Sequence, residues 1–222
     1  MVLRAIKRED LPRPRFRGSS HKYAFFASLV TGAVLVIVAP SDKATTAAAI
    51  YAASVSGLFG ASALYHRITW RPATRRWMRR LDHSMIFVLI AGTYTPFALL
   101  VLHGTLSNVV LVVVWAGALA GVVLKLAWVD APKWLMAAIY LALGWVGVAT
   151  APQVLARAGA GALTLLAVGG LLYTAGAVIY ALRRPDPRPK VFGYHEIFHV
   201  LVIVAAAAHY AAIAGYAIPA HA

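Results

Sequence analysis

The chain has 222 residues, of which 61% are hydrophobic and 13% charged, and it contains no cysteine. Soluble domains carry about twice this share of charged residues, so the composition excludes that class and is typical of a helical membrane protein. The formal net charge of +14 does not indicate nucleic-acid binding, because the basic residues form short clusters between apolar runs, as membrane-topology signals do. Without cysteine, a disulfide framework and thiolate metal ligands are excluded as well.

Seven apolar runs follow one another along the chain, at residues 24–40, 44–66, 82–102, 106–128, 134–152, 160–182 and 194–217. Each has the length of roughly 17 to 25 residues at which an α-helix crosses about 30 Å of hydrocarbon. The sequence therefore predicts an all-α membrane protein, a seven-transmembrane helix bundle at 24–217. A basic N-terminal segment (1–23) precedes this single domain, and a short tail (218–222) follows it.

The basic residues also predict the orientation of this bundle. Nineteen of the 21 Lys and Arg residues lie in the N-terminal segment, in the loops after the second, fourth and sixth runs, or, for Lys125, at the end of the fourth run, and only Lys43 and Arg157 lie in the other loops. Cytoplasmic loops carry an excess of Lys and Arg. We therefore expect a multi-pass protein of the inner (plasma) membrane, with its N-terminus in the cytoplasm, its C-terminus outside, and membrane lipids as its partners.

A few ionisable residues lie in or beside these apolar runs, where they are energetically unfavourable and usually functional. His66 ends the second run, Asp82 opens the third, and His195 and His199 open the seventh. With the N-terminus inside, an even-numbered span ends at the cytoplasm and an odd-numbered span begins there. All four residues are therefore predicted at the same depth, close to one another.

His195 and His199 are four residues apart, which places both imidazoles on one helix face about 6 Å apart along the axis. Together with His66 they would complete the three-ligand pattern of an open zinc site, whose bound water has a pKa of about 7. Asp82 would hydrogen-bond that water or bind the ion directly, and the residues do not decide between the two. Ser62, one turn before His66, is placed to orient an imidazole or a substrate oxygen.

Glu196 completes an H-E-x-x-H motif, in which the glutamate of soluble zinc proteases is the general base. It is rotated by about 100° from His195, so it could face the metal or contact water or an arginine, and both alternatives stay open. His209 lies about 15 Å farther along the same helix and is expected to have a structural or pocket-lining role. His83 points about 100° away from Asp82 around the helix and is expected to have a partner at the level of the lipid headgroups rather than to bind the metal. The other three histidines are expected in solvated loops or the tail: His21, His103 and His221.

Three segments, SALYH (62–66), LDHSMIFVLIAGTYTP (81–96) and GYHEIFHVLVIVAAAAHY (193–210), together resemble the hemolysin III-like bacterial branch of the progestin and adipoQ receptor family. That family shares an S-x-x-x-H, Asp, H-x-x-x-H pattern with alkaline ceramidases and other membrane hydrolases. The resemblance implies zinc bound by three histidines, with the aspartate near the metal-bound water. Glu196 is not part of the pattern. The residues that match it are Ser62, His66, Asp82, His195 and His199.

Three functions are compatible with these observations. The first is a zinc-dependent hydrolase of lipid amides or esters, similar to a ceramidase, because an open three-histidine site at this depth is reached by amphiphilic substrates. The second is a non-enzymatic sensor or regulator of membrane fluidity or energetics, with zinc as a structural clamp. An intramembrane zinc protease is the third; it requires a further acidic ligand, and no Asp or Glu follows Glu196, so Asp82 would have to supply that ligand from another helix.

Overall fold

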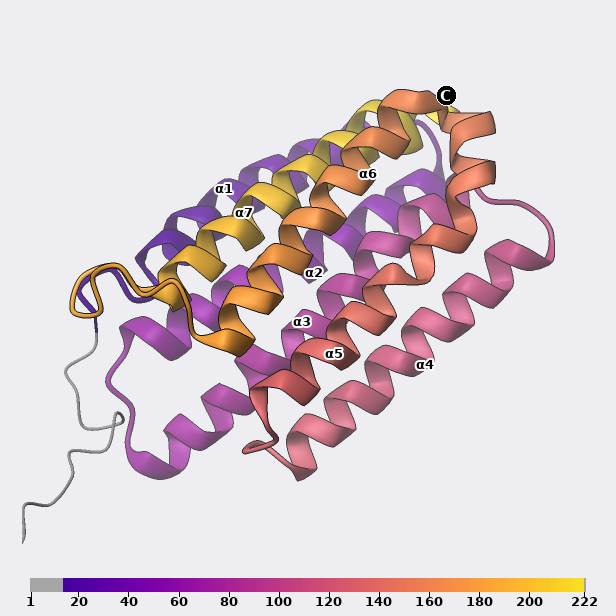
Figure 1. Ribbon diagram of the computed structural model, residues 1–222. Coiled ribbons are helices and arrows are strands. Elements are labelled where there is room, and N and C mark those ends of the chain that lie inside the picture. The colour runs from indigo at the N-terminus through magenta and orange to yellow at the C-terminus, as the bar shows by residue number, and fades with distance from the viewer. Residues whose placement is uncertain (1–13, 222) are drawn as a thin grey trace, which may run out of the picture.

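The computed structural model describes residues 14–221 and is all-α, with no strand within that range. Figure 1 shows the bundle. Its helices are α1 (Ser19–Ile37), α2 (Asp42–Arg67), α3 (Pro72–Leu100), α4 (Thr105–Ala127), α5 (Lys133–Gly144), the 3₁₀ segment η2 (Trp145–Thr150), α6 (Ala151–Leu182), α7 (Tyr194–Ala212), the π segment η3 (Ile213–Ala217) and the short η4 (Pro219–His221).

Six helical segments of the described chain are long and apolar enough to cross a membrane. They are α1, α2, α3, α4, the run Lys133–Leu182 that joins α5 to α6, and Tyr194–Ala217. Large apolar side chains such as Ile37, Val112 and Leu119 lie exposed on the outside of the bundle. Such a surface is unfavourable in water and suits a lipid environment. The chain is thus a multi-pass membrane protein.

The run Lys133–Leu182 contains a sharp reversal. Gly159 has φ 82° and ψ 173° within it, a backbone conformation that side chains disfavour and glycine tolerates. In Figure 1, α6 returns alongside α5 in the opposite direction. The turn falls between the two apolar runs predicted at 134–152 and 160–182, although helical structure continues through Gln153 and up to the glycine.

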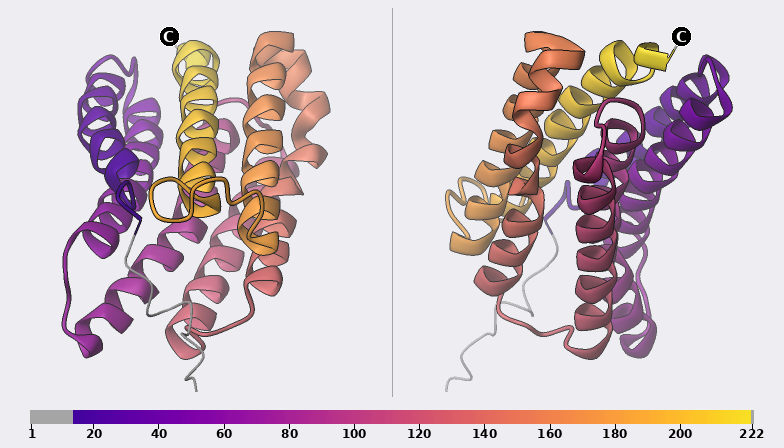
Figure 2. Two further views of the ribbon diagram at one scale, coloured as in Figure 1. Left: turned by 60° about the vertical axis from the view of Figure 1, so that its left-hand side comes forward. Right: turned by 90° about the vertical axis from the view of Figure 1, so that its right-hand side faces the viewer.

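Close packing of neighbouring helices holds the bundle together. The helices α1 to α4 pack in chain order, and α7 lies between α1 and α6 (Figures 1 and 2). A Cβ atom on Gly92 of α3 would lie 2.1 Å from Oγ of Ser54 in α2, and one on Gly121 of α4 would lie 2.3 Å from the Phe87 ring. Small residues permit this approach, as is common between membrane helices.

Two helices begin well before the apolar runs that predicted them. The helix α1 starts at Ser19 rather than at 24, so it takes in part of the segment predicted as an N-terminal extension. The helix α3 starts at Pro72 rather than at 82, because proline suits the first helical turn even where the following residues are basic. Hydropathy locates the part of a helix that lies in lipid, whereas the helix itself continues into its polar turns.

Candidate metal centre

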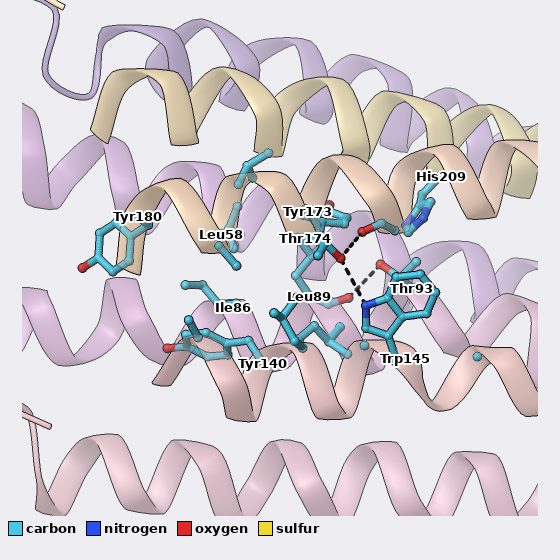
Figure 3. A pocket seen from close by; sticks show the side chains of 18 of the residues that line it. Leu58, Ile86, Leu89, Thr93, Tyr140, Trp145, Tyr173, Thr174, Tyr180 and His209 are labelled. Atoms are coloured by element: carbon cyan, nitrogen blue, oxygen red, sulfur yellow. Dashed lines mark hydrogen bonds between the residues drawn. The ribbon is translucent and has the colours of Figure 1, made fainter. Parts of the chain in front are cut away.

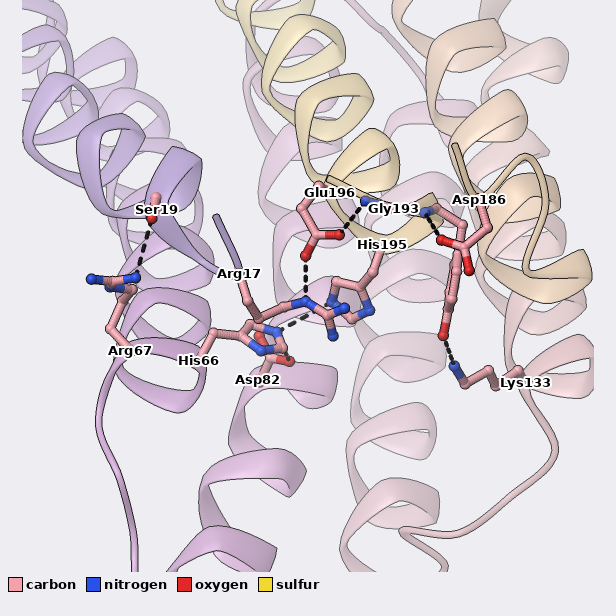
Figure 4. Close-up of polar contacts among 11 residues, drawn as sticks. Arg17, Ser19, His66, Arg67, Asp82, Lys133, Asp186, Gly193, His195 and Glu196 are labelled. Carbon is pink, nitrogen blue, oxygen red and sulfur yellow. Dashed lines mark hydrogen bonds and ion pairs between the residues drawn. The ribbon is translucent and has the colours of Figure 1, made fainter. Parts of the chain in front are cut away.

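Three imidazoles from two helices meet at one end of the bundle. His66 lies in the last turn of α2, and His195 and His199 lie in the first two turns of α7. One ring nitrogen from each residue can be chosen so that all three lie within 4.8 Å of one another. His66 and His195, far apart in sequence, point toward each other in Figure 4. The structure thus brings together the three residues that were predicted as metal ligands.

The geometry of the triad fits a metal ion that prefers imidazole ligands. Nε2 of His66 and Nε2 of His195 are 3.3 Å apart, close to the roughly 3.3–3.4 Å that separates two nitrogens bound at about 2.0–2.1 Å to a tetrahedral ion. Nδ1 of His199 is buried and has no hydrogen-bond partner among residues 14–221. Because an unpaired buried polar atom is unfavourable, such a nitrogen favours the presence of a ligand.

Asp82 borders the triad on the side of His66. Its Oδ2 lies 3.8 Å from Nε2 of His66 and 3.9 Å from Nε2 of His83, and its side chain is largely buried. Ser62 interacts with the Asp82 carboxyl group, and its Oγ lies 2.8 Å from Nδ1 of His21. The serine therefore connects the aspartate to a further imidazole beside the triad.

His21 is that further imidazole, and the prediction that it is solvated is wrong. Its side chain is buried, with 3% of the residue exposed. The ring stacks on His199 with centroids 3.8 Å apart and an interplanar angle of 6°, and Nε2 lies 3.3 Å from the His199 carbonyl oxygen. The reason is the early start of α1, which places His21 on a helical turn packed against α2 and α7. His21 thereby fixes the orientation of the His199 ring.

The carboxylate of Glu196 is engaged away from the triad. It is 2% exposed, it forms an ion pair with Arg17, and it accepts a hydrogen bond of 2.8 Å from the Gly193 amide (Figure 4). The contact with the Gly193 amide is a capping interaction at the N-terminus of α7. The sequence left open whether Glu196 faces the metal or contacts water or an arginine, and in the structure it pairs with an arginine.

Residues 14–18, which include Arg17, cover the triad from outside the bundle. The amides of Arg15 and Phe16 donate to the carbonyl oxygens of Lys190 and Val191, at 3.1 and 3.3 Å. A Cβ atom on Gly18 would lie 2.4 Å from Cβ of His66. Residues 14–18 and the loop before α7 therefore close one side of the site.

On the other side, His195 and His199 of the triad line a cavity of about 320 Å³ inside the bundle. At the triad end the cavity is lined by His199, Asp82 and Ser62, its middle is apolar, and its far end is lined by polar residues on α3, α6, α7 and η2. Figure 3 shows this far end, where the Trp145 indole donates to Thr174 Oγ1 at 3.1 Å. The apolar lining includes Leu58, Ile86, Leu89, Phe198 and Val202.

The family model described as "Haemolysin-III related" matches residues 10–210. The chain belongs to the haemolysin-III-related family. It is 36% identical over 170 residues to the hemolysin-3 homolog of Bacillus subtilis (strain 168), with 76% of each chain covered. It is 30% identical over 198 residues to the hemolysin-3 of Bacillus cereus, with 87% of each covered.

More distant relatives connect this family to the adiponectin receptors. The chain is 34% identical over 149 residues to the heptahelical transmembrane protein ADIPOR2 of Oryza sativa subsp. japonica, which covers 60% of this chain and 65% of the relative. Similarity extends to the monocyte to macrophage differentiation factor of Homo sapiens, at 26% identity over 201 residues, 89% of this chain and 81% of the relative. The resemblance of the three sequence motifs to the progestin and adipoQ receptor family is confirmed.

The other histidines of this haemolysin-III-related protein lie outside the triad. His209 lines the far end of the cavity, with Nε2 at 3.2 Å from the Leu166 carbonyl oxygen. His103 is exposed in the loop between α3 and α4, as expected. His221 stands in the short η4, at the end of the described residues.

Sequence reasoning missed two residues: His21, which packs against the triad, and Arg17, which pairs with Glu196. His21 follows the same depth rule that selected Asp82, because it lies at the start of an odd-numbered span, only three residues before the predicted boundary. Arg17 and Glu196 are 179 residues apart, and no local pattern links an arginine in a basic segment to one particular glutamate.

Proposed function

We propose that this protein is a zinc-dependent hydrolase that acts on the amide or ester bond of a membrane lipid. The observation that carries the proposal is that His195 and His199, two of the three imidazoles of the triad, line the polar end of a largely apolar cavity of about 320 Å³. Ligand pockets of proteins have volumes of about 300–1,000 Å³ and combine apolar walls with a few convergent polar groups. A lipid would place its hydrocarbon in the apolar part and its carbonyl group at the triad.

In this proposal the triad holds zinc, which would supply Lewis acidity toward the carbonyl oxygen and the attacking water. Asp82 is the proton-transfer group, because its Oδ2 lies within 4 Å of His66 Nε2 at the same end of the cavity. Ser62 orients the Asp82 carboxyl group on one side and His21 on the other. His21 in turn holds the His199 ring by stacking. Glu196 has no catalytic role here, since its carboxylate is paired with Arg17.

We also propose that the chain crosses the bilayer seven times, with its N-terminus in the cytoplasm. The run Lys133–Leu182 has 50 residues, and a straight helix of that length would measure about 75 Å, more than twice the hydrocarbon thickness. Its reversal at Gly159 divides it into two crossings. A relative described as heptahelical and the distribution of Lys and Arg support the same topology. Cysteine labelling from either side tests it, at Lys43 in the exposed first turn of α2 and at the exposed loop residue Lys190, because the two should react from opposite sides.

The hydrolase proposal is tested with purified protein in detergent micelles. We expect about one zinc ion per chain and release of fatty acid from a ceramide or an acyl lipid. His199→Ala should lose both metal and turnover, whereas His103→Ala, at an exposed loop position, should retain both. Equal turnover by the wild type and His199→Ala would contradict the assignment of the reaction to the triad.

A structural metal is the second candidate, and the packing of the helices favours it. The helix α2 packs mainly on α1 and α3, whereas α7 packs mainly on α6 and α1, so a metal on the triad would link two helices that otherwise contact each other little. A non-enzymatic regulator of membrane fluidity or energetics would need only this clamp. His66→Ala should then lower metal content and melting temperature together. Loss of metal with an unchanged melting temperature would contradict the structural role.

A further inference from the structure

Three cationic side chains line the cavity at the end where the triad lies. They are Arg79 of α3, Lys125 of α4 and Lys133 of α5. All three are within electrostatic reach of His83, the neighbour of Asp82. Among the described residues that line this cavity, Asp82 is the only carboxylate, and it faces the imidazoles of His66 and His83. The cations therefore outnumber the anions at the cavity wall.

Lys125 is buried without a carboxylate of its own. The residue is 2% exposed, and its ammonium donates to the Val129 carbonyl oxygen at 3.3 Å. The same oxygen accepts from Arg79 at 3.2 Å, and the nearby Asp130 carboxylate pairs with Arg79 at 2.8 Å. One carboxylate thus serves two cations. A lysine near a helix C-terminus is favourable for the helix dipole, but such a lysine ordinarily extends its ammonium into water, and this one is enclosed.

Lys133 is placed against the helix dipole. It is the first residue of α5, where the positive end of the dipole disfavours a cation and favours an anion. Its ammonium donates to Tyr194 Oη at 3.1 Å (Figure 4) and lies 4.4 Å from the centroid of the Tyr180 ring. The side-chain cations within electrostatic reach of it are Arg183 and Arg17. A phenol and a ring face supply partial negative charge only, so the position remains suited to an anion.

We propose that Lys125 and Lys133, with Arg79 behind them, form a subsite for the phosphate of an anionic lipid whose acyl chain occupies the cavity. The inference rests on the proposed function in that one amphiphile fills the cavity, and it adds the charge of the headgroup. Lysine binds phosphate as a point charge and through charge-assisted hydrogen bonds. The apolar wall beyond the lysines selects a phosphate that carries hydrocarbon over free phosphate.

The test is binding rather than turnover. Purified protein is titrated with a short-chain phosphatidic acid, with diacylglycerol of the same chains, and with inorganic phosphate, and binding is followed by the shift in melting temperature and by native mass spectrometry. We expect phosphatidic acid to bind at least about 10-fold more tightly than either other ligand, as loss of a charge-assisted hydrogen bond implies. Lys125→Met and Lys133→Met should each remove most of that preference, whereas Lys190→Met, at an exposed loop position, should retain it.

Equal affinity for phosphatidic acid and diacylglycerol, or a preference unchanged in both lysine variants, would overturn the subsite. Inorganic phosphate that binds as tightly as phosphatidic acid would overturn the assignment to a lipid. If Lys125→Met does not fold, Lys133→Met decides, because its side chain is only partly buried. His199→Ala keeps both lysines and should therefore still prefer phosphatidic acid. If the wild type binds phosphatidic acid but hydrolyses neither this lipid nor ceramide, the hydrolase proposal is refuted and the subsite stands.

Discussion

Replacing Gly18 by alanine is expected to weaken metal binding without touching a metal ligand. Gly18 precedes the first turn of α1 with φ 74° and ψ 0°, and a Cβ atom there would lie 2.4 Å from Cβ of His66. The substitution therefore has two effects. It introduces a side chain into a left-handed backbone conformation, and it presses that side chain against the base of a triad residue.

The magnitude follows from these two terms. A left-handed conformation is unfavourable for an alanine by about 1–2 kcal/mol, and overpacking of this kind by about 1–3 kcal/mol. The sum of about 2–5 kcal/mol is large enough for residues 14–18 to move away from the site, or for His66 to shift. Loss of groups that orient metal ligands typically lowers metal affinity by about 10–100-fold, and we expect a decrease of that size.

Gly104→Ala is the control for backbone strain without a steric clash, because Gly104 has φ 66° and ψ −153°, a conformation at least as unfavourable for alanine, and has nothing within 4 Å of the added Cβ. Metal affinity is measured by competition with a chromophoric chelator, and stability by the melting temperature in the same detergent. Both variants should be less stable than the wild type, and only Gly18→Ala should lose metal affinity. Unchanged metal affinity in Gly18→Ala would refute the view that residues 14–18 pack against His66.

Three further outcomes are expected. Arg17→Met leaves the buried Glu196 carboxylate without its partner and should lower stability by about 1–3 kcal/mol, less than for a fully buried pair because Arg17 is partly exposed; a melting temperature equal to that of the wild type would contradict this. His21→Phe keeps a ring to stack on His199 but removes the bond to Ser62, so it should lower metal affinity less than His21→Ala, and equal losses in the two variants would argue against stacking. Removal of the metal by a chelator should lower the melting temperature, and added Zn²⁺ should restore it; indifference to both would exclude a link between α2 and α7.

The sequence predicted the membrane segments because hydropathy responds to the same property that places a helix in lipid. It also predicted which ionisable residues meet, since alternating spans bring their ends to common levels and only a few polar residues occupy those levels. His66 and His199 are 133 positions apart, yet this argument was sufficient to place them together. The prediction required no knowledge of how the helices pack sideways.

The same reasoning could not predict where helices end or which residues distant in sequence form pairs. The helix α3 begins at Pro72 because a proline and a run of good helix formers suffice, whatever their polarity. Because α1 starts at Ser19, His21 lies in its first turn and is buried against the triad, whereas the sequence predicted a solvated loop residue. The pairing of Glu196 with Arg17 depends on the path of residues 14–18 along the loop before α7, and no sequence periodicity predicts that path.

The position of the N-terminal segment determines from where a ligand can reach the triad. Arg17 and Gly18, held by the ion pair to Glu196 and by the backbone bonds to the loop before α7, cover the side of His66 that faces away from the bundle. On the opposite side, His195 and His199 line the cavity, whose walls are largely apolar. A water-soluble substrate would have to displace the covering segment, whereas a lipid can enter between helices whose outer surfaces already face hydrocarbon. The cover over His66 and the apolar cavity therefore favour an amphiphilic ligand, and this argument does not depend on the proposed metal chemistry.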